Sequence, residues 1–250
     1  MRLFILTGAS RGLGRAMASQ LLAADLLLLT IERTPDASLP REARAAGAQI
    51  EQWALDVAHD LGVAARLEAW LHQQAGQRFA SVTLINNAGV IGTVGPVDLA
   101  PADEIATVLR VGLEAPMNLT AAFLRATVDW PCERRILNIS SGAGRSPIAG
   151  WAPYCAAKAG LDHFSRVTAL DEARRPNGAK IVALAPGVID TSMQSQLRAA
   201  DAAGFPDKQR FLDLHAQSQL ASPDAAATKV LAYLARADYG KNPVADVRDA

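Results

Sequence analysis

A glycine-rich segment near the N-terminus is the feature that most restricts how this chain can fold. The segment Thr7-Gly8-Ala9-Ser10-Arg11-Gly12-Leu13-Gly14 follows the short apolar stretch Leu3–Leu6 and precedes a helix predicted over Ala16–Ala24. Its glycines permit a tight turn, and a helix N-terminus offers free N–H groups and a partial positive charge. A strand, a glycine turn and a helix in this order predict a binding site for a pyrophosphate. The alternative is a purely structural turn, but the position between strand and helix argues against it.

Short apolar stretches and helical stretches alternate along the rest of the chain. Further strands are predicted over Leu26–Thr30, Gln49–Leu55, Val82–Ile85, Arg135–Ile139 and Lys180–Ala185. Further helices are predicted over Leu61–Ala75, Ala102–Ala126 and Tyr154–Asp171. This alternation predicts the α/β class, with a single doubly wound parallel sheet covered by helices on both faces.

We expect residues 1–250 to form one domain, because no linker-like stretch divides the chain. The segment from about 188 to 222 lacks a strand and holds Gly204, Pro206 and mixed helical pieces. A long excursion after a strand often covers a site, so we expect a substrate lid here. The alternative is a surface insertion without a role.

Composition excludes several classes of protein. The formal net charge is zero, which argues against a nucleic-acid binder that relies on global charge. Two cysteines are too few for a disulfide framework, so we expect a cytoplasmic protein. We expect no signal peptide and no membrane span. Four histidines are scattered without ligand spacing, so we expect no metal site.

A tyrosine and a lysine four residues apart indicate proton-transfer chemistry. Tyr154 and Lys158 share one face of a predicted helix, and Ser141 lies thirteen positions before Tyr154. A tyrosine pKa near ~10 is too high for proton transfer at neutral pH, and a nearby cation lowers it. Lowering this pKa to ~7 needs about 4 kcal/mol of differential stabilisation. The spacing predicts a tyrosine general acid beside a hydroxyl group; the alternative is an ordinary surface pair.

Charged residues near the end of the second strand bear on which dinucleotide binds. Arg11 lies in the glycine turn and Arg33 lies just past the second strand, where a dinucleotide ribose sits. Arginine favours the 2′-phosphate of NADP, whereas an acid such as Glu32 favours the free 2′-hydroxyl of NAD. Two arginines against one glutamate predict NADP(H), with NAD(H) as the alternative. The alternative is that Arg11 and Arg33 are ordinary solvated charges on the protein surface.

The chain resembles the short-chain dehydrogenase/reductase family over essentially its whole length. The motifs that carry the resemblance are Thr7-Gly8-x-x-x-Gly12-x-Gly14, Asp56-Val57, Asn86-Asn87-Ala88-Gly89, Ser141, Tyr154-x-x-x-Lys158 and Pro186-Gly187-x-x-x-Thr191. Within the family, Gly150-Trp151-x-x-Tyr154-Cys155 and Pro186-Gly187-Val188-Ile189-Asp190-Thr191-x-Met193-Gln194 look like the benzil reductase branch, which is similar to sepiapterin reductases. The resemblance implies a Rossmann-type fold and an NADPH-dependent carbonyl reductase that transfers hydride to a ketone or diketone.

The resemblance also implies roles for individual residues. Tyr154 would be the proton donor, Ser141 would hold the substrate carbonyl, and Lys158 would bind the nicotinamide ribose and depress the tyrosine pKa. Asp56 would bind the adenine, and Ile189 and Thr191 would hold the nicotinamide carboxamide. The full set of cofactor-binding residues is Gly8, Ser10, Arg11, Gly12, Leu13, Gly14, Arg33, Asp56, Val57, Asn86, Asn87, Ala88, Gly89, Tyr154, Lys158, Pro186, Gly187, Ile189 and Thr191.

Gly112 departs from the family pattern. It stands in Arg110-Val111-Gly112-Leu113-Glu114, where the family usually carries an asparagine that helps hold a water linked to the lysine. Glycine keeps the backbone carbonyl, costs ~1 kcal/mol in a helix interior, and lets the helix adopt a local irregularity. One hypothesis is a proton relay of reduced efficiency; the other is a broken relay in a protein that only binds the cofactor.

Trp151 and Met193 are predicted to line an apolar substrate pocket from the lid side, with Ser141 and Tyr154 as the other substrate contacts. Ordinary core packing is the alternative for Trp151 and Met193, and is favoured for Phe205 and Phe211. The expected partner is a small carbonyl compound, in a homodimer or homotetramer formed through the helices at Ala102–Ala126 and Tyr154–Asp171. An NAD-dependent alcohol dehydrogenase and a catalytically weak dinucleotide-binding protein are the alternative functions.

Overall fold

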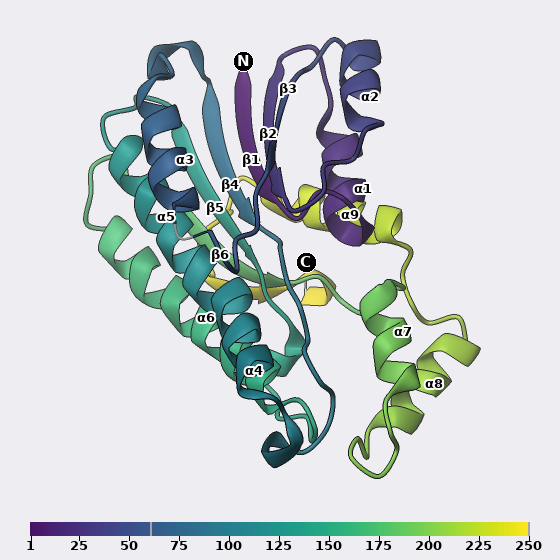
Figure 1. The fold of residues 1–250 in the computed structure, drawn as a ribbon. Coiled ribbons are helices and arrows are strands. Elements are labelled where there is room, and N and C mark those ends of the chain that lie inside the picture. Colours follow the sequence, from purple (N-terminus) through teal and green to yellow (C-terminus); the bar gives the residue numbers. More distant parts are fainter. Residues whose placement is uncertain (61, 250) are drawn as a thin grey trace.

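The computed structural model describes residues 1–60 and 62–249 and contains a sheet of seven parallel strands (Figure 1). The strand order is β3-β2-β1-β4-β5-β6-β7, and every neighbouring pair runs parallel. The strands are β1 (Arg2–Thr7), β2 (Leu26–Glu32), β3 (Gln49–Ala54), β4 (Ser81–Asn86), β5 (Glu133–Ile139), β6 (Lys180–Ala185) and β7 (Val244–Asp246). The predicted parallel sheet is therefore confirmed.

The central strands are apolar on both faces because helices cover both faces. All seven residues of β2 are buried, and so are five of the six in β1. Parallel strands need crossover helices, which exclude water from both sides of the sheet. The chain builds outward through β2 and β3 from one side of β1, and through β4 to β7 from the other side. The direction thus reverses between β1 and β4, and ligands bind at the carboxyl ends of the strands at such a point.

Helices lie in two layers (Figure 1). One layer holds α1 (Gly12–Leu21), α2 (Leu39–Ala46) and α9 (Pro223–Leu234). The opposite layer holds α3 (Val63–His72), α4 (Ala102–Leu109), α5 (Ala115–Ala126) and α6 (Ala152–Glu172). Two further helices, α7 (Ser192–Ala199) and α8 (Lys208–Ala216), lie beyond the carboxyl ends of the strands. Helices on both faces confirm the doubly wound arrangement.

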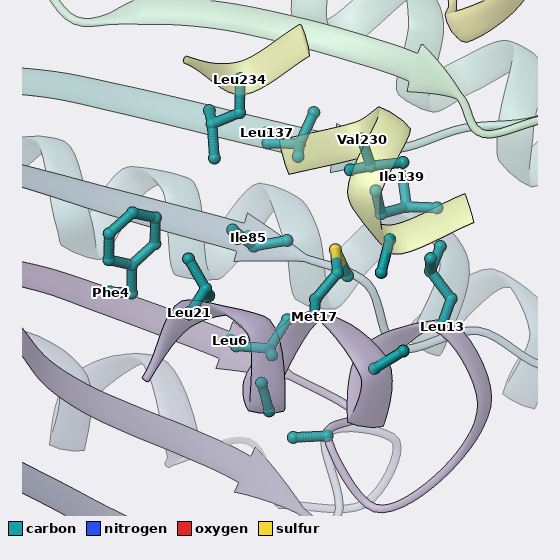
Figure 2. Close-up of a cluster of buried hydrophobic side chains, with 14 of the residues drawn as sticks. Phe4, Leu6, Leu13, Met17, Leu21, Ile85, Leu137, Ile139, Val230 and Leu234 are labelled. Atoms are coloured by element: carbon teal, nitrogen blue, oxygen red, sulfur yellow. The ribbon is translucent and has the colours of Figure 1, made fainter. Parts of the chain in front are cut away.

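Each helix layer packs on one face of the sheet through its own apolar cluster. Figure 2 shows the cluster between α1, α9 and the sheet, where Met17 of α1 and Val230 of α9 meet Ile85 and Leu137 of the strands. On the opposite face, Phe123 of α5 belongs to a second cluster with strand and α3 side chains. Burial of apolar surface contributes about 25 cal/mol per Å² and is the main stabilisation of a sheet packed between two helix layers.

Several predicted boundaries are wrong, for local reasons. α1 begins at Gly12 rather than Ala16 and ends at Leu21 rather than Ala24, and its first residue has a left-handed backbone with φ +55°. The helix predicted over Leu61–Ala75 spans Val63–His72, and Leu61 lies outside the described residues. α2, α9 and β7 are present although no element was predicted at their positions. β7 has three residues, too few to show a strand periodicity.

The helix predicted over Ala102–Ala126 is interrupted. α4 ends at Leu109, a π-helical turn spans Arg110–Glu114, and α5 follows from Ala115. π-turns appear mostly as single irregularities within α-helices, often near functional sites. Among the described residues, no helix is both long and apolar enough to cross a membrane.

Candidate active site

A cavity of about 1450 Å³ opens at the carboxyl ends of the strands. Its walls bring together segments from the whole length of the chain, from the glycine turn to the loop after β6. The predicted site residues on its walls are Gly8, Ser10, Arg11, Gly12, Leu13, Gly14, Arg33, Asp56, Val57, Asn87, Ala88, Gly89, Ser141, Trp151, Tyr154, Lys158, Pro186, Gly187, Ile189, Thr191 and Met193. Residues separated by up to 185 positions therefore share one cavity, since parallel strands end at the same edge of the sheet.

The glycine turn is held tightly against the end of β4. A Cβ added at Gly14 would lie 2.1 Å from the carbonyl oxygen of Gly8, so only glycine fits there. Gly8 adopts a left-handed backbone with φ +73°. The Asn87 side chain donates to the carbonyl oxygens of Thr7 and Gly8, at 3.0 and 3.1 Å. The turn is thus shaped by backbone contact rather than by side-chain packing.

The N-terminus of α1 suits an anion. Arg11 occupies the N-cap without a side-chain hydrogen bond to the helix, and the first turn of α1 carries no acidic residue. Gly12 and Leu13, at the start of α1, line the cavity. Uncapped N–H groups and the positive end of the helix dipole favour phosphate oxygens. These residues fit the pyrophosphate of a dinucleotide.

Asn86 does not belong to the cavity, contrary to the resemblance. It is the last residue of β4, only 3 % exposed, and does not line the cavity. Its amide donates to Asn138 Oδ1 of the neighbouring strand β5 at 2.8 Å and to Thr120 Oγ1 of α5 at 3.4 Å. Successive side chains of a strand point to opposite faces, so Asn86 and Asn87 are directed differently. Asn87 is the one that faces the glycine turn.

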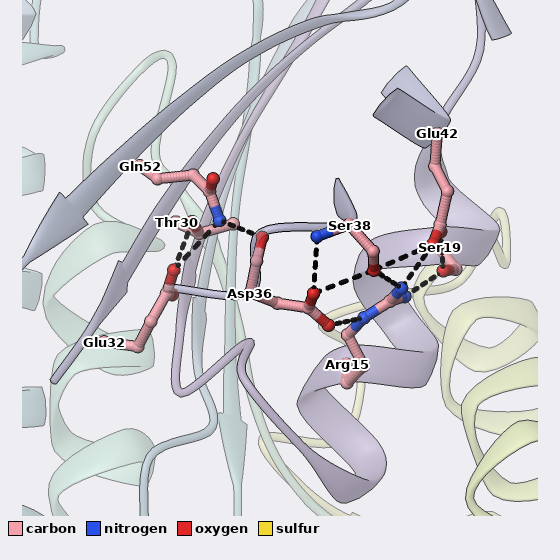
Figure 3. Close-up of polar contacts among 8 residues, drawn as sticks. All are labelled: Arg15, Ser19, Thr30, Glu32, Asp36, Ser38, Glu42 and Gln52. Carbon is pink, nitrogen blue, oxygen red and sulfur yellow. Dashed lines mark hydrogen bonds and ion pairs between the residues drawn. The ribbon is translucent and has the colours of Figure 1, made fainter. Parts of the chain in front are cut away.

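A polar network fixes the segment after β2 (Figure 3). Arg15 of α1 binds the carboxylates of Asp36 and Glu42 and the hydroxyls of Ser19 and Ser38. Asp36 also accepts from the Ser38 backbone, which together with Arg15 holds the Asp36 pKa at about 2. Asp36 is therefore charged and already paired, and the loop that follows Arg33 is tied to α1.

Glu32 lies on the other side of this loop, at the end of β2. It is 4 % exposed, its Oε1 accepts from Thr30 Oγ1 at 2.8 Å, and Gln52 lies 3.5 Å away. Burial raises the pKa of Glu32. Arg11 and Arg33, by contrast, are exposed on the cavity wall.

Tyr154, Lys158 and Ser141 come from two elements that meet at the cavity. Tyr154 and Lys158 are buried on the first two turns of α6, and Ser141 follows β5 in an extended conformation. Lys158 Nζ donates to the carbonyl oxygen of Ile139 at 2.7 Å and lies 5.7 Å from the centroid of the Tyr154 ring. The lysine is therefore anchored to the end of β5 rather than bound to the phenol.

The ionisation of this pair differs from the sequence-based expectation. Burial raises the pKa of Tyr154 to about 12, although a hydrogen bond with Ser141 opposes the rise. Burial lowers the pKa of Lys158 to about 8, opposed by the charge of Asp162. The predicted lowering of the tyrosine pKa is wrong for the protein without a cofactor. Desolvation, which disfavours both charged forms, outweighs the attraction between neighbours.

Gly112 lies at the centre of the π-turn and is buried against α6. A Cβ on Gly112 would come 3.1 Å from the Cβ of Ala157, which is tighter than an ordinary contact. The helical irregularity is thus present with glycine at this position, as the sequence analysis anticipated. The cost of Gly112 in helix propensity is offset by close packing between the π-turn and α6.

Aromatic side chains line the cavity beside Tyr154. The ring centroid of Trp151 lies 4.9 Å from that of Tyr154 and 5.8 Å from that of Phe211. Phe205 is fully buried behind them, as predicted for core. Phe211 is also buried but lines the cavity, although core packing was the favoured interpretation for it. Met193 contributes from α7.

Sequence reasoning missed several wall residues outside the motifs, among them Val94, Ile148, Gln194 and Leu214. They come from loops and from α7 and α8, whose positions depend on tertiary packing. Gln194 had one available signal, because it directly follows Met193 in the motif quoted above. Among residues 1–60 and 62–249, no group of three or more potential ligands is arranged to hold a metal ion.

Comparison with known proteins assigns the family. A family model described as short chain dehydrogenase matches residues 2–202. The chain belongs to the short-chain dehydrogenase/reductase family. The protein is accordingly an NAD(P)-dependent oxidoreductase. Its glycine turn and its Tyr154–Lys158 pair are among the motifs on which the resemblance to this family was based.

Named relatives of this short-chain dehydrogenase/reductase are reductases. It is 34 % identical over 244 residues to the benzil reductase ((S)-benzoin forming) of Bacillus cereus, covering 98 % of both chains. It is 31 % identical over 258 residues to the sepiapterin reductase of Rattus norvegicus, covering 98 % of this chain and 95 % of that protein.

Solved structures agree with the family. The KRED1-Pglu enzyme superposes with a TM-score of 0.79 at 28 % identity, over 98 % of this chain and 100 % of that one. A Beutenbergia cavernae protein solved with NADP at low occupancy gives a TM-score of 0.81 at 27 % identity, over 98 % and 94 % of the two chains.

Proposed function

We propose that this protein is an NADPH-dependent carbonyl reductase that acts on medium-sized apolar ketones or diketones. The observation that carries the proposal is one cavity whose walls include the glycine turn, the three residues Ser141, Tyr154 and Lys158, and the aromatic side chain of Trp151. A cofactor site, a proton donor and an apolar surface are the three parts that such a reaction requires.

The dinucleotide would be held by cavity-lining residues of the glycine turn, of the strand ends and of α6. The N-terminus of α1 would bind the pyrophosphate, Asp56 the adenine and Lys158 the nicotinamide ribose. When bound, the reduced nicotinamide supplies a hydride to the carbonyl carbon. Ile189 and Thr191 would hold the carboxamide; both lie on the cavity wall after β6.

Tyr154 would protonate the carbonyl oxygen. Its raised pKa keeps the phenol protonated at neutral pH, so the proton passes only to a strong base. A carbonyl oxygen becomes such a base as its carbon is reduced and the electron pair of the C=O bond moves onto oxygen. Ser141 would donate a hydrogen bond to that oxygen, and the positive charge of Lys158 would stabilise the phenolate left behind.

The proposed preference for NADPH rests on Arg11 and Arg33. Both side chains are exposed on the cavity wall and free to meet a 2′-phosphate. The acidic competitor, Glu32, is buried with one oxygen bound to Thr30. An NAD-dependent alcohol dehydrogenase remains the second candidate, because Glu32 still lines the cavity.

The proposed substrate class rests on the aromatic end of the cavity and on the names of the relatives. Trp151, Phe211 and Met193 offer apolar surface beside Tyr154. Apolar groups that flank the carbonyl of a ketone or diketone would pack against this surface.

The remaining proposals concern organisation. We propose one domain over residues 1–250, a lid at about 188–222 formed by α7 and α8, and a cytoplasmic homodimer or homotetramer. Exposed apolar side chains on and beside the proposed interface helices, Met117, Val167 and Leu170, support the oligomer. The lid is supported by the contribution of Met193 and Phe211 to the cavity.

The test measures NADPH consumption against a panel of diketones and monoketones, with Tyr154→Phe as the control. We expect turnover by the wild type and a loss of at least a hundred-fold in the variant. A clear preference for NADH would favour the alcohol dehydrogenase. If wild type and variant are equally inert while both bind NADPH, the protein is the catalytically weak binding protein that Gly112 suggests.

A further inference from the structure

A buried carboxylate lies one helical turn beyond Lys158, outside the cavity wall. Asp162 of α6 is 1 % exposed and does not line the cavity. It accepts hydrogen bonds from the hydroxyl of Ser140 and, at 3.1 Å, from Nε of Arg145. A fully buried acid is costly unless it is paired, and here both carboxylate oxygens have a donor.

Lys158 and Asp162 bind consecutive residues at the end of β5. Lys158 Nζ donates to the carbonyl oxygen of Ile139 at 2.7 Å, and Asp162 accepts from Ser140. The next residue is Ser141, the proposed carbonyl-orienting hydroxyl. The backbone N–H of Ser140 donates to Leu184 of β6 at 2.9 Å, so the strand end is fixed from both sides. Lys158 and Asp162 on α6 therefore hold Ile139 and Ser140, the two residues that precede Ser141.

The charges around Lys158 come from few elements. α6 contributes Tyr154 and Asp162, the loop after β5 contributes Arg145, and β7 contributes Asp246, which is close enough to sense Arg145. Asp162 favours the charged form of Lys158, whereas burial disfavours it. Arg145 partly offsets the charge of Asp162, and also donates to the carbonyl oxygen of Ala245 at 2.8 Å.

We propose that Asp162 is a positioning residue of the reaction, holding the segment from Ile139 to Ser141 against α6 and keeping Lys158 positively charged. It acts through Ser140 and Lys158 and touches neither the substrate nor the cofactor. This inference rests on the proposed function, since it assigns Asp162 to the same site.

The competing interpretation is that Asp162 only stabilises the fold, and Glu172 is the matched control for it. Glu172 is also on α6, is also 1 % exposed, and pairs with the buried Arg134 at 3.2 Å. It lies ten residues beyond Asp162 and far along the helix from Lys158. Removing its charge costs stability in the same way without reaching the site.

The experiment compares Asp162→Asn, Asp162→Glu and Glu172→Gln with the wild type. NADPH affinity is measured by fluorescence between about pH 6 and 9.5, and kcat is measured over the same range. With Asp162 neutral, Lys158 loses its proton at lower pH, so the alkaline fall in affinity is expected to begin about one pH unit lower in Asp162→Asn. Asp162→Glu is expected to recover most of this shift, and Glu172→Gln to show none.

Arg145→Gln keeps the inference testable if Asp162→Asn does not fold. The Arg145 side chain is 29 % exposed, against 2 % for that of Asp162. Its removal leaves the charge of Asp162 less offset, so the alkaline fall in NADPH affinity is expected to begin at higher pH. If neither Asp162→Asn nor Arg145→Gln shifts the affinity profile, Asp162 is structural and the inference is wrong. If the wild type binds NADPH but reduces no carbonyl, the proposed function fails while the affinity profiles still decide the role of Asp162.

Discussion

Replacing Lys158 by methionine is expected to make the protein without its cofactor more stable while abolishing its activity. Lys158 is a nearly fully buried cation, and burial lowers its pKa from 10.5 to about 8. At roughly 1.4 kcal/mol per pH unit, this corresponds to roughly 3 kcal/mol of destabilisation at neutral pH. Methionine fills a similar volume without a charge to desolvate.

The variant also loses one favourable contact. Its side chain cannot donate to the carbonyl oxygen of Ile139, a hydrogen bond worth about 1 kcal/mol net. We therefore expect Lys158→Met to raise the free energy of unfolding by about 2 kcal/mol at pH 7. Such a gain would mean that the site holds its lysine at the expense of stability, a known trade-off in enzymes.

The pH dependence of the stability difference between Lys158→Met and the wild type tests whether desolvation of the lysine is the cause. Between about pH 8 and 10.5, unfolded wild-type chains bind the Lys158 proton more tightly than folded ones, so wild-type stability rises with pH in that window. Roughly 2 kcal/mol of the cost is recovered at about pH 9.5, and the advantage of the variant shrinks accordingly. Measurements stop below about pH 10, where Tyr154 begins to ionise in the unfolded chain.

Urea unfolding at about pH 7 and pH 9.5 measures both effects. Lys180→Met serves as the control, because Lys180 is 42 % exposed in its pair with Glu133 and is expected to change stability by less than about 1 kcal/mol at either pH. If Lys158→Met is no more stable than the wild type at pH 7, or if its difference does not depend on pH, the reasoning about desolvation is wrong.

Three further predictions concern the cofactor, the π-turn and the substrate. Arg33→Ala is expected to weaken NADPH binding ten- to a hundred-fold, roughly the loss of one hydrogen bond to a charged group, and to leave NADH affinity nearly unchanged; equal losses would argue against a 2′-phosphate contact. Gly112→Asn is expected to destabilise the protein by about 1–3 kcal/mol by crowding Ala157, with a double variant containing Ala157→Gly more stable than the single changes add up to. If Gly112→Asn leaves turnover and its pH profile unchanged, the asparagine side chain is irrelevant to the proton relay. Trp151→Ala is expected to raise KM for apolar ketones and diketones several-fold, because it removes apolar surface beside Tyr154, and an unchanged KM would show that Trp151 does not contact the substrate.

The fold was largely predictable because its signals are local. Six strands were found from short apolar stretches, with boundaries that differ from the structure by two residues at most. The seventh strand was missed since three residues at the edge of a sheet carry no pattern. The helix interruption at Gly112 was only anticipated, because a π-turn depends on packing against α6 as well as on the residues within it.

The residues of the candidate site were predictable as a set, but their states were not. The motifs named side chains that do share one cavity, apart from Asn86, whose amide is bound to Asn138 of β5 and Thr120 of α5. The spacing of Tyr154 and Lys158 suggested a lowered tyrosine pKa, whereas burial raises it. Spacing predicts which side chains are neighbours along one helix, but it does not predict how far the folded structure buries each side chain from water.

The sequence by itself determined the glycine turn, the alternation of strands and helices, and the family to which the chain belongs. These follow from short-range features, namely where glycine is required and how apolar residues repeat. Only the tertiary structure decided which way Asn86 faces, how deeply Tyr154 and Lys158 are desolvated, and that Asp162 lies against Ser140. Each of these depends on contacts between distant parts of the chain, because burial and electrostatics sum over every neighbour in space.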